Sequence, residues 1–472
     1  MKHKTFLFIP VISLLVTITG CKKFVEVKDP DFVVVRSRVF NSDEAAMAAR
    51  AGMYASMAQG VSITNGQGTK LTALYADELW PTTKATVIDL PFYNHAILPS
   101  SMVIDNLWSR SYTTLYLANA ILEGLSGATA VSDSLRREMM GEARCVRAMS
   151  YSCLINLFGD VPLVLATDYH TTSWLPRSPV PVVYQQILAD LQAAIPLLPL
   201  VRLRPDTTTP GNVRITRWAA KAMLARVLLY QGDWAAAKAI AGEIIEAGPF
   251  SLNANLATTF LIHSPETIFQ LQPVVEGVNS AEGALFLPNT GMPPYVATKT
   301  FLDSLEPGDG RKSAWMGAYT EGSDTLLYPY KYKVKSGTPV KEYSVVLRLA
   351  ELYLIRAEAS ARLDLLQGPD GALSDLNKVR ARAQLAPLPT GWNGQQVMAA
   401  IEQERRVEFF AEWSHRFIDL KRWPGVQNPA TSRWQEVMKG YKPTQGSFLE
   451  LWPIPASQLK LNGGLIQNPG YS

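Results

Sequence analysis

Apolar residues recur at helical spacing through most of this chain. In the segment 102–125, Leu107, Ser111, Leu115, Ala118 and Leu122 fall on one stripe, the pattern of a helix with one buried face. The same periodicity predicts further helices. It begins near Asn41, where Ser and Asp residues are typical of a helix start. These helices are expected at 133–159, 181–199, 217–232, 233–248, 345–364 and 371–385.

The predicted helices come in pairs. The segments 217–232 and 233–248 meet at Gly232-Asp233, a helix stop followed at once by a helix start. Small residues alternate with large ones, as at Ala222, Ala225 and Tyr230, which resembles tetratricopeptide repeats. Helix pairs of this kind must stack to bury their apolar faces. The pattern therefore predicts a mainly α fold, a tetratricopeptide-like bundle of helical pairs.

Three parts of the chain lack this period. The segment 251–344 is rich in Pro, Gly and aromatic residues, which indicates a loop-rich lobe with short strands at 266–272 and 326–334. The segment 61–100 is punctuated by Gly, Pro and Asn and is expected to be an irregular loop. The C-terminal segment 451–472 contains several Pro and Gly residues and is expected to be extended over the surface.

The N-terminus has the features of a lipoprotein signal. A basic start is followed by an apolar run at 5–17, shorter than the roughly 20 residues that span a bilayer. Gly20 directly precedes Cys21, which resembles the bacterial lipobox. The sequence therefore predicts a signal peptide at 1–20, lipidation of Cys21, and an extended tether at 21–40.

Composition and charge exclude several classes of function. The chain is 47% hydrophobic and 18% charged, with a net charge of only +4, and no block of Lys or Arg follows residue 23. It therefore has no basic stripe for nucleic acid. Cys145 and Cys153 lie eight apart in one predicted helix, about 12 Å, too far for a disulfide. They are expected to be free, buried thiols, and the scattered histidines predict neither a metal site nor a cofactor.

The segment 404–423, ERRVEFFAEWSHRFIDLKRW, decides between an enzyme and a scaffold. As a single helix it has one apolar face, with Glu404, Glu408 and Glu412 along another line and Arg416 one turn beyond Glu412. Two catalytic carboxylates must face each other across a substrate, whereas these point the same way. We therefore expect the glutamates to form ion pairs at the edge of a packed helix. No GxSxG, HExxH or P-loop motif accompanies them.

Aromatic and polar residues in the predicted loops are candidates for ligand contact. Sugar rings stack on aromatic side chains, and their hydroxyl groups form hydrogen bonds with amide and imidazole groups. For each aromatic residue alone, burial at a junction between a loop and a helix is an equal alternative. The predicted ligand-binding set is Trp80, Tyr93, Asn94, His95, Tyr295 and Trp315.

Five segments together resemble the SusD/RagB family. They are CKKFVEV, EARCVRAMSYSCLINLFGDVPLV, LRLAELYLIRAEA, ERRVEFFAEWSHRFIDLKRW and LWPIPASQLKLNGGLIQNPGY, and they follow the family's order over nearly the whole mature chain. The resemblance implies a SusD-like fold with a helical region at 41–250, a ligand-binding lobe at 251–344, and a helical region with an extended tail at 345–472.

The resemblance also implies a function. Members are lipoproteins of the outer membrane that face the outside of the cell, bind glycans or peptides, and cover a SusC-like TonB-dependent transporter without catalysis. We therefore expect a protein that captures oligosaccharide for such a transporter. Two alternatives remain open, a peptide-binding uptake subunit of the RagB type and an envelope glycoside hydrolase.

Overall fold

The computed structural model describes residues 39–201, 211–442 and 449–471. The predicted signal peptide, Cys21 and nearly all of the predicted tether lie outside these ranges. Across the described residues, no helix combines the length and the apolar character needed to cross a membrane.

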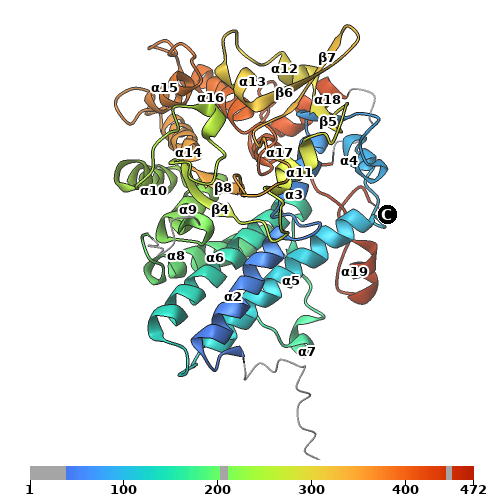
Figure 1. Ribbon diagram of the computed structural model, residues 1–472, viewed down its shortest axis with the longest axis vertical. Coiled ribbons are helices and arrows are strands. Elements are labelled where there is room, and N and C mark those ends of the chain that lie inside the picture. The colour runs from blue at the N-terminus through green and yellow to red at the C-terminus, as the bar shows by residue number, and fades with distance from the viewer. Residues whose placement is uncertain (1–38, 202–210, 443–448, 472) are drawn as a thin grey trace, which may run out of the picture.

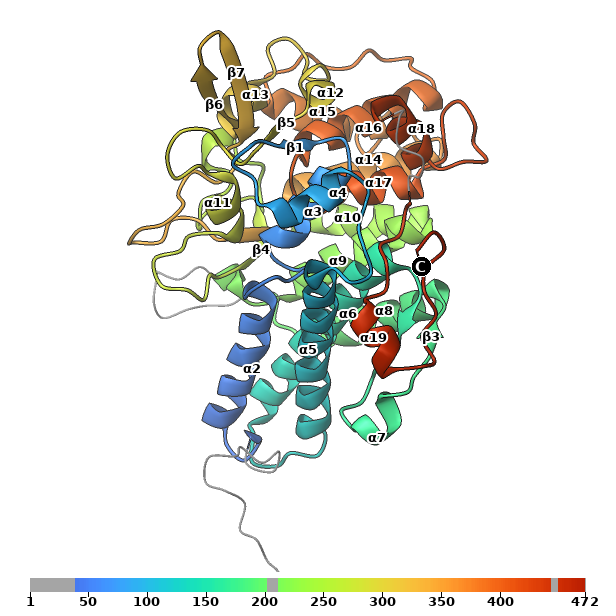
Figure 2. The same ribbon diagram turned by 90° about the vertical axis from the view of Figure 1, so that its right-hand side faces the viewer.

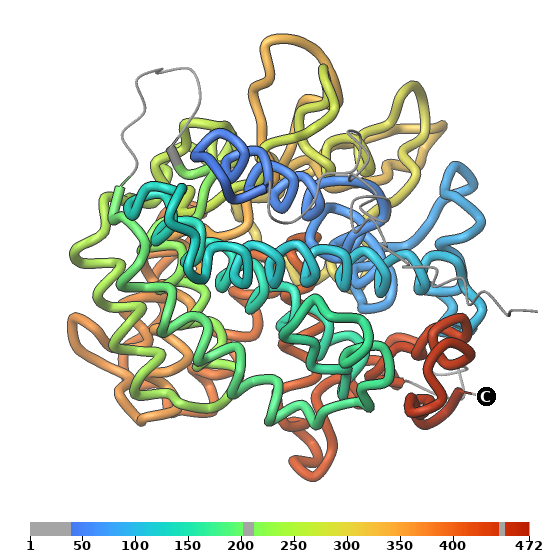
Figure 3. Tube along the Cα trace, turned by 90° about the horizontal axis from the view of Figure 1, so that it is seen from below, coloured from blue at the N-terminus to red at the C-terminus, as the bar shows by residue number. Residues whose placement is uncertain are grey.

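Long helices stack side by side in chain order, as predicted, and form the lower and left parts of the molecule in Figure 1. Each packs against the next, and Figures 2 and 3 show the same succession from two other sides. They are α2 (Asp43–Ala58), α5 (Met102–Leu125), α6 (Asp133–Phe158), α8 (Val180–Ala194), α9 (Arg217–Gln231), α10 (Trp234–Ala247), α14 (Leu349–Arg362) and α15 (Ala372–Arg382).

The turn between α9 and α10 forms as the sequence predicts. Gly232 ends α9 in the left-handed conformation with φ of 78°, which glycine adopts without steric cost. The carboxylate of Asp233 then accepts a hydrogen bond from the amide of Ala236 and caps α10. Small residues such as Ala225 and Ala241 are fully buried, so the two helices approach closely.

The remaining segments form short two-stranded ribbons and short helices, most of them over the upper end of the stack and some beside its lower part (Figures 1 and 2). The antiparallel ribbons pair β1 (Leu79–Pro81) with β5 (Tyr295–Ala297), β2 (Val161–Pro162) with β3 (Arg177–Ser178), β4 (Thr267–Leu271) with β8 (Ser344–Arg348), and β6 (Met316–Glu321) with β7 (Asp324–Pro329). The short helices are α7 (Tyr169–Thr172), α11 (Ala281–Phe286), α12 (Lys299–Leu302), α13 (Gly310–Trp315), α18 (Arg433–Tyr441) and α19 (Ala456–Leu461).

Two strand predictions have different outcomes. The strand expected at 266–272 is present as β4, whereas the one expected at 326–334 is confirmed only over its first residues, in β7. The helix expected from residue 345 begins instead at Leu349, because Ser344–Arg348 form the buried strand β8 paired with β4. A run of consecutive buried residues shows neither the alternation of a half-buried strand nor the spacing of a surface helix. The sequence pattern therefore did not reveal this strand.

The prediction of an irregular loop at 61–100 is wrong. This segment contains α3 (Gly66–Tyr75), β1, the 3-10 turn η2 (Val87–Asp89) and α4 (Leu90–Tyr93). Nearly every residue of α3 is buried, so the helix has no polar face that would reveal its period. Asn65 caps its start through a hydrogen bond from the amide of Gln67.

The prediction of one continuous helix at 404–423 is also wrong. Helix α16 (Gly394–Glu408) ends at Glu408, and α17 (His415–Arg422) begins after a tight turn with positive φ at Ala411, Trp413 and Ser414. Such backbone is costly for residues with a Cβ. Tertiary hydrogen bonds offset the cost, because the Ala411 amide donates to Glu78 Oε1 at 2.9 Å and the Trp413 indole donates to the Val345 carbonyl at 2.7 Å.

Candidate ligand site and a buried charge network

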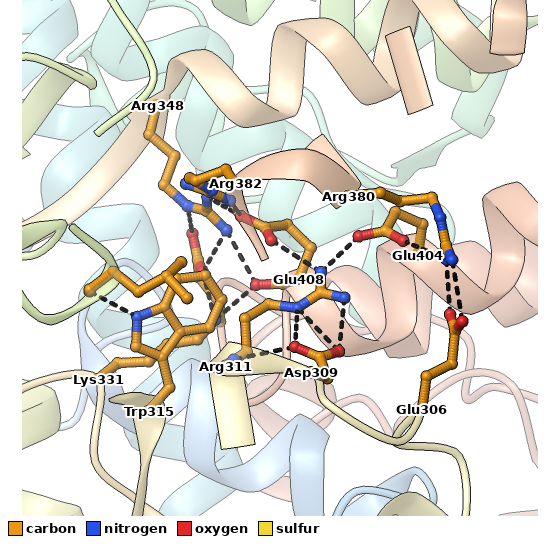
Figure 4. Close-up of polar contacts among 12 residues, drawn as sticks. Glu306, Asp309, Arg311, Trp315, Lys331, Arg348, Arg380, Arg382, Glu404 and Glu408 are labelled. Atoms are coloured by element: carbon orange, nitrogen blue, oxygen red, sulfur yellow. Dashed lines mark hydrogen bonds and ion pairs between the residues drawn. The ribbon is translucent and has the colours of Figure 1, made fainter. Parts of the chain in front are cut away.

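The glutamates of the 404–412 segment lie inside the protein, not at the edge of a helix. Glu404, Glu408 and Glu412 are 1%, 0% and 8% exposed. Arg311 Nη1 lies 2.5 Å from Glu404 Oε1 and 3.0 Å from Glu408 Oε2. Figure 4 shows the arginines converging on Glu408 from separate elements, since Arg311 lies in α13, Arg348 in β8 and Arg382 in α15.

Glu412 does not pair with Arg416 as predicted. Its Oε1 accepts from Arg348 Nε at 2.7 Å, and its Oε2 accepts from Lys331 Nζ at 2.7 Å. Arg416 instead binds Asp77, with Nε 2.8 Å from Oδ1. The turn after α16 breaks the helical spacing on which the expected pair depended.

Charge balance keeps Glu408 ionised despite its burial. Burial alone would raise the pKa of Glu408, but the charges of Arg382, Arg348 and Arg311 outweigh it and hold that pKa well below its usual range. Burial lowers the pKa of Lys331 to about 8 against the opposing effect of Glu412. These carboxylates therefore connect separate elements of the fold through ion pairs, and a substrate has no access to them.

Trp315 belongs to the same buried region. It is the last residue of α13 and only 2% exposed, not a loop residue as predicted. Its indole N–H donates to the Leu256 carbonyl at 2.9 Å, and Lys331 Nζ lies 4.9 Å from the ring centroid. Its ring therefore offers no face to a ligand.

A cavity of about 560 Å³ opens beside α3, η2, β5 and the segment after α11, and we call it the β5 pocket. Its volume lies within the usual range of small-ligand sites. Tyr295 is buried in its wall and donates its hydroxyl proton to Asp89, which also pairs with Lys70 at 2.9 Å. The lining combines polar and apolar groups, among them Thr86, Ile88, Asn289, Thr290, Met292 and Pro294.

Trp80 lies near this pocket but on another face. In the β1–β5 ribbon, Trp80 pairs with Val296 and Pro81 pairs with Tyr295. Because successive side chains of a strand point to opposite faces, Trp80 and Tyr295 point away from each other. Trp80 is half-buried, and both residues belong to strands where the sequence predicted loops.

Tyr93, Asn94 and His95 lie together at the end of α4. The His95 ring stacks on Tyr75 with 4.2 Å between centroids, and its Nε2 lies 2.7 Å from the Tyr75 carbonyl oxygen. Burial, aided by the charge of Lys442, lowers the pKa of His95 to about 3, so the ring is neutral. Lys442 Nζ lies over the Tyr93 ring at 4.1 Å, and Asn94 is exposed.

The six predicted ligand residues thus do not form one surface, and Tyr295 alone among them lines the β5 pocket. The analysis of the sequence missed the other charged residues of this pocket, namely Lys70, Lys84, Asp89 and Lys335. They come from three separate segments and follow no local spacing. No pattern in the sequence marked them as a group.

Neither a disulfide nor a metal cluster occurs in the part of the chain that the structure describes. Cys145 and Cys153 are free thiols, as expected, but only Cys145 is buried, whereas Cys153 is half-buried. Its partial burial raises the pKa of the Cys153 thiol to about 11. Among the described residues, no group of three or more His, Cys, Asp or Glu side chains is placed to hold a metal ion.

Two family models match this chain over most of its length. The model described as "SusD family" matches residues 309–471, and the one described as "Starch-binding associating with outer membrane" matches residues 24–229. The chain therefore belongs to the SusD/RagB family.

Individual relatives agree with this assignment. SusD-like protein P25 of Formosa agariphila is 26% identical over 540 residues, which cover 98% of each chain. The starch-binding protein SusD of Bacteroides thetaiotaomicron is 30% identical over 175 residues, 35% of this chain and 29% of that protein.

Solved structures show the same fold. A SusD superfamily protein from Parabacteroides distasonis superposes with a TM-score of 0.76 at 21% identity, covering 91% of this chain and 99% of that one. A laminarin-binding SusD-like protein gives 0.73 at 23% identity, covering 91% and 100%. The predicted fold class, a mainly helical SusD-like bundle, is confirmed.

Proposed function

We propose that this protein captures oligosaccharide outside the cell and delivers it to a SusC-like TonB-dependent transporter of the outer membrane. The β5 pocket carries the proposal, because it is a cavity of ligand size that joins hydroxyl and amide groups to an apolar wall. Membership of the SusD/RagB family supports a glycan as the ligand, as do the names of the starch-binding and laminarin-binding relatives.

The proposed role is capture without catalysis. The three glutamates of the 404–412 segment, Glu404, Glu408 and Glu412, form ion pairs with arginine and lysine side chains that enclose them. In the β5 pocket, Asp89 is the one acid among the described lining residues, whereas glycoside hydrolysis usually needs two. An acid pair of that kind is therefore missing from the described part of this pocket.

Anchoring is proposed through Cys21. A diacylated cysteine binds firmly to a membrane because two chains together bury many CH₂ groups. The description of the matching N-terminal family model, which names association with the outer membrane, supports that location. Labelling of cells with a palmitate analogue should modify the natural chain and not the Cys21→Ala variant.

Calorimetry against a panel of neutral and acidic oligosaccharides tests the binding role. We expect heat from at least one sugar and no release of reducing ends over the same period. Thr290 is an exposed residue of the pocket rim, so Thr290→Trp should fill the cavity and abolish binding without affecting the core. Thr325→Trp, at an exposed position of the β6–β7 hairpin, is the matched control.

Each outcome has a defined meaning. No heat from any sugar would overturn the proposed function. Binding that survives Thr290→Trp would show that the glycan binds elsewhere on the protein. Sugar hydrolysis that persists in purified protein would make it an enzyme.

A further inference from the structure

The β5 pocket has an excess of positive charge. Its charged lining residues are Lys70, Lys84, Lys335 and Asp89, three cations against one acid in the described part of the lining. They reach the cavity from different elements, since Lys70 lies in α3, Asp89 ends η2, and Lys335 follows β7 along the chain. The fold therefore gathers charges that the sequence keeps far apart.

The single acid is already neutralised. Lys70 Nζ lies 2.9 Å from Asp89 Oδ2, and these side chains are 6% and 1% exposed. The hydroxyl of Tyr295 donates to the same oxygen. Burial and the neighbouring Asp89 raise the pKa of Tyr295 above its usual value, so this donor stays neutral. Lys70, Asp89 and Tyr295 therefore bind one another, and together they contribute no net charge to the cavity.

The other two lysines remain uncompensated. Lys335 is half-buried, and its Nζ donates to the Leu287 carbonyl at 2.9 Å, a neutral acceptor that leaves the charge in place. Lys84 is exposed at the rim. Across the residues that the structure describes, neither ammonium group forms an ion pair with a carboxylate. Two like charges beside one cavity favour an anion between them.

A second cleft of comparable size differs in how its cations are bound. The cleft between α16 and the segment after α17 has about 500 Å³, and its lining cations are Arg362, Arg406 and Arg433. Arg406 pairs with Asp77 at 2.7 Å and Arg433 with Glu402 at 3.1 Å. Two of its three cations are thus bound to carboxylates of the protein, and the guanidinium of Arg362 lies 5.5 Å from the centroid of the Trp234 ring.

We propose that the β5 pocket selects acidic oligosaccharides, in which a uronate carboxylate or a sulfate ester lies between Lys84 and Lys335. The neutral polar groups of the lining that are exposed, such as Asn289 and Thr290, are available to the sugar hydroxyls. This inference rests on the proposed function, that the pocket binds a glycan, and adds the charge class of that glycan. Ammonium groups bind both kinds of anion, so the two sources are distinguished by experiment.

Calorimetry with the folded, soluble protein tests this selectivity. The probes are trigalacturonate for the carboxylate, a κ-carrageenan oligosaccharide for the sulfate, and laminaritriose as the neutral sugar. We expect at least one acidic probe to bind about tenfold or more tightly than laminaritriose at 50 mM NaCl. The advantage should shrink several-fold at 500 mM NaCl, because salt shortens the range of charge interactions to roughly 4 Å.

A double variant, Lys84→Gln with Lys335→Gln, assigns the effect to these lysines. It should weaken the acidic probe about tenfold or more and remove most of its salt dependence, leaving laminaritriose unchanged. Lys460→Gln, at an exposed position of α19 outside the pocket, is the control and should change nothing. The salt dependence of the natural protein provides a second measurement that needs no variant.

The outcomes separate this inference from the proposed function. Binding of laminaritriose as tight as that of both acidic probes would overturn the selectivity and keep the proposed function. Unchanged affinity in the double variant would also overturn the role of the lysines. No binding of any sugar would overturn both, and binding of hexaglutamate as tight as the best acidic sugar would show a site for acidic chains in general.

Discussion

Asp89 and Lys70 form an ion pair beneath the β5 pocket, with 2.9 Å between Oδ2 and Nζ and side-chain exposures of 1% and 6%. The hydroxyl of Tyr295 also donates a hydrogen bond to the Asp89 carboxylate. Because both charges are removed from water, each depends on the other for its stability. The pair fixes η2 against α3 and thereby shapes one wall of the cavity.

Asp89→Asn should therefore destabilise the protein strongly. The substitution leaves the Lys70 ammonium buried without a charged partner, and we expect a loss of about 3–5 kcal/mol in the free energy of unfolding. Urea denaturation followed by tryptophan fluorescence measures it. Asp303→Asn breaks a Lys299–Asp303 pair that is 85% and 60% exposed, and should cost less than about 1 kcal/mol. Equal effects of the two substitutions would contradict the role given to burial.

Glu358 makes stability depend on acid pH. Burial would raise the pKa of Glu358, but Arg422, bound through two hydrogen bonds of 2.6 Å each, outweighs it and lowers the pKa to about 2. In the unfolded chain the pKa is about 4.5. The stabilisation is therefore complete at neutral pH and is lost as the pH falls from about 5 towards 2.

The variant Glu358→Gln isolates this effect. It should be less stable than the natural protein at pH 7, by roughly 3 kcal/mol, since Arg422 loses its main partner. The difference should narrow as the pH is lowered from 5 to 3, measured by urea denaturation at each pH. Glu246→Gln, at a side chain 65% exposed, serves as the control. A difference that stays constant with pH would rule out this explanation.

Gly68 allows α3 to lie close to the preceding segment. A Cβ at this position would lie 2.3 Å from the Ile63 carbonyl oxygen, a backbone atom that cannot rotate away. We expect Gly68→Ala to lower the free energy of unfolding by about 1–3 kcal/mol. Gly52→Ala, in α2 where no heavy atom lies within 4 Å, should raise it by up to about 1 kcal/mol. Thermal denaturation of both variants checks the opposite signs.

Trp80 tests whether the ligand extends beyond the β5 pocket. Its half-buried ring lies on the face of the β1–β5 ribbon opposite Tyr295. If a glycan reaches across this edge, Trp80→Ala should weaken binding about three- to tenfold through loss of stacking. Trp174→Ala removes a ring that is 68% exposed near α7, at the other end of the molecule in Figures 1 and 2, and should have no effect. Unchanged affinity for Trp80→Ala would confine the ligand to the pocket.

The helical stack was predictable because its signal is local. In α5, Leu107, Leu115 and Ala118 of the predicted stripe are buried, so the spacing along the chain reports the fold directly. Helix α3 and strand β8 were not predictable, because both are buried on all sides and lose their period. The break after Glu408 was missed for another reason, since distant groups such as Glu78 and Val345 hold the strained turn in place.

The candidate site was predicted only in part. Tyr295 was expected from its aromatic surroundings and does line the cavity, whereas Trp315 was expected for the same reason and is enclosed by Lys331 and Leu256. Residue type alone does not distinguish a ring at a cavity from a ring in the core. That distinction depends on which segments pack above it.

The sequence by itself determined the family, the paired helices and the free thiols, because periodicity and motif order are properties of neighbouring residues. The tertiary structure alone decided that Glu408 is enclosed by Arg311, Arg348 and Arg382, and that Lys84 and Lys335 line the same cavity. Charges interact through space over a few ångströms, whatever their separation along the chain. Their partners therefore become known only once the helices and ribbons are folded against each other.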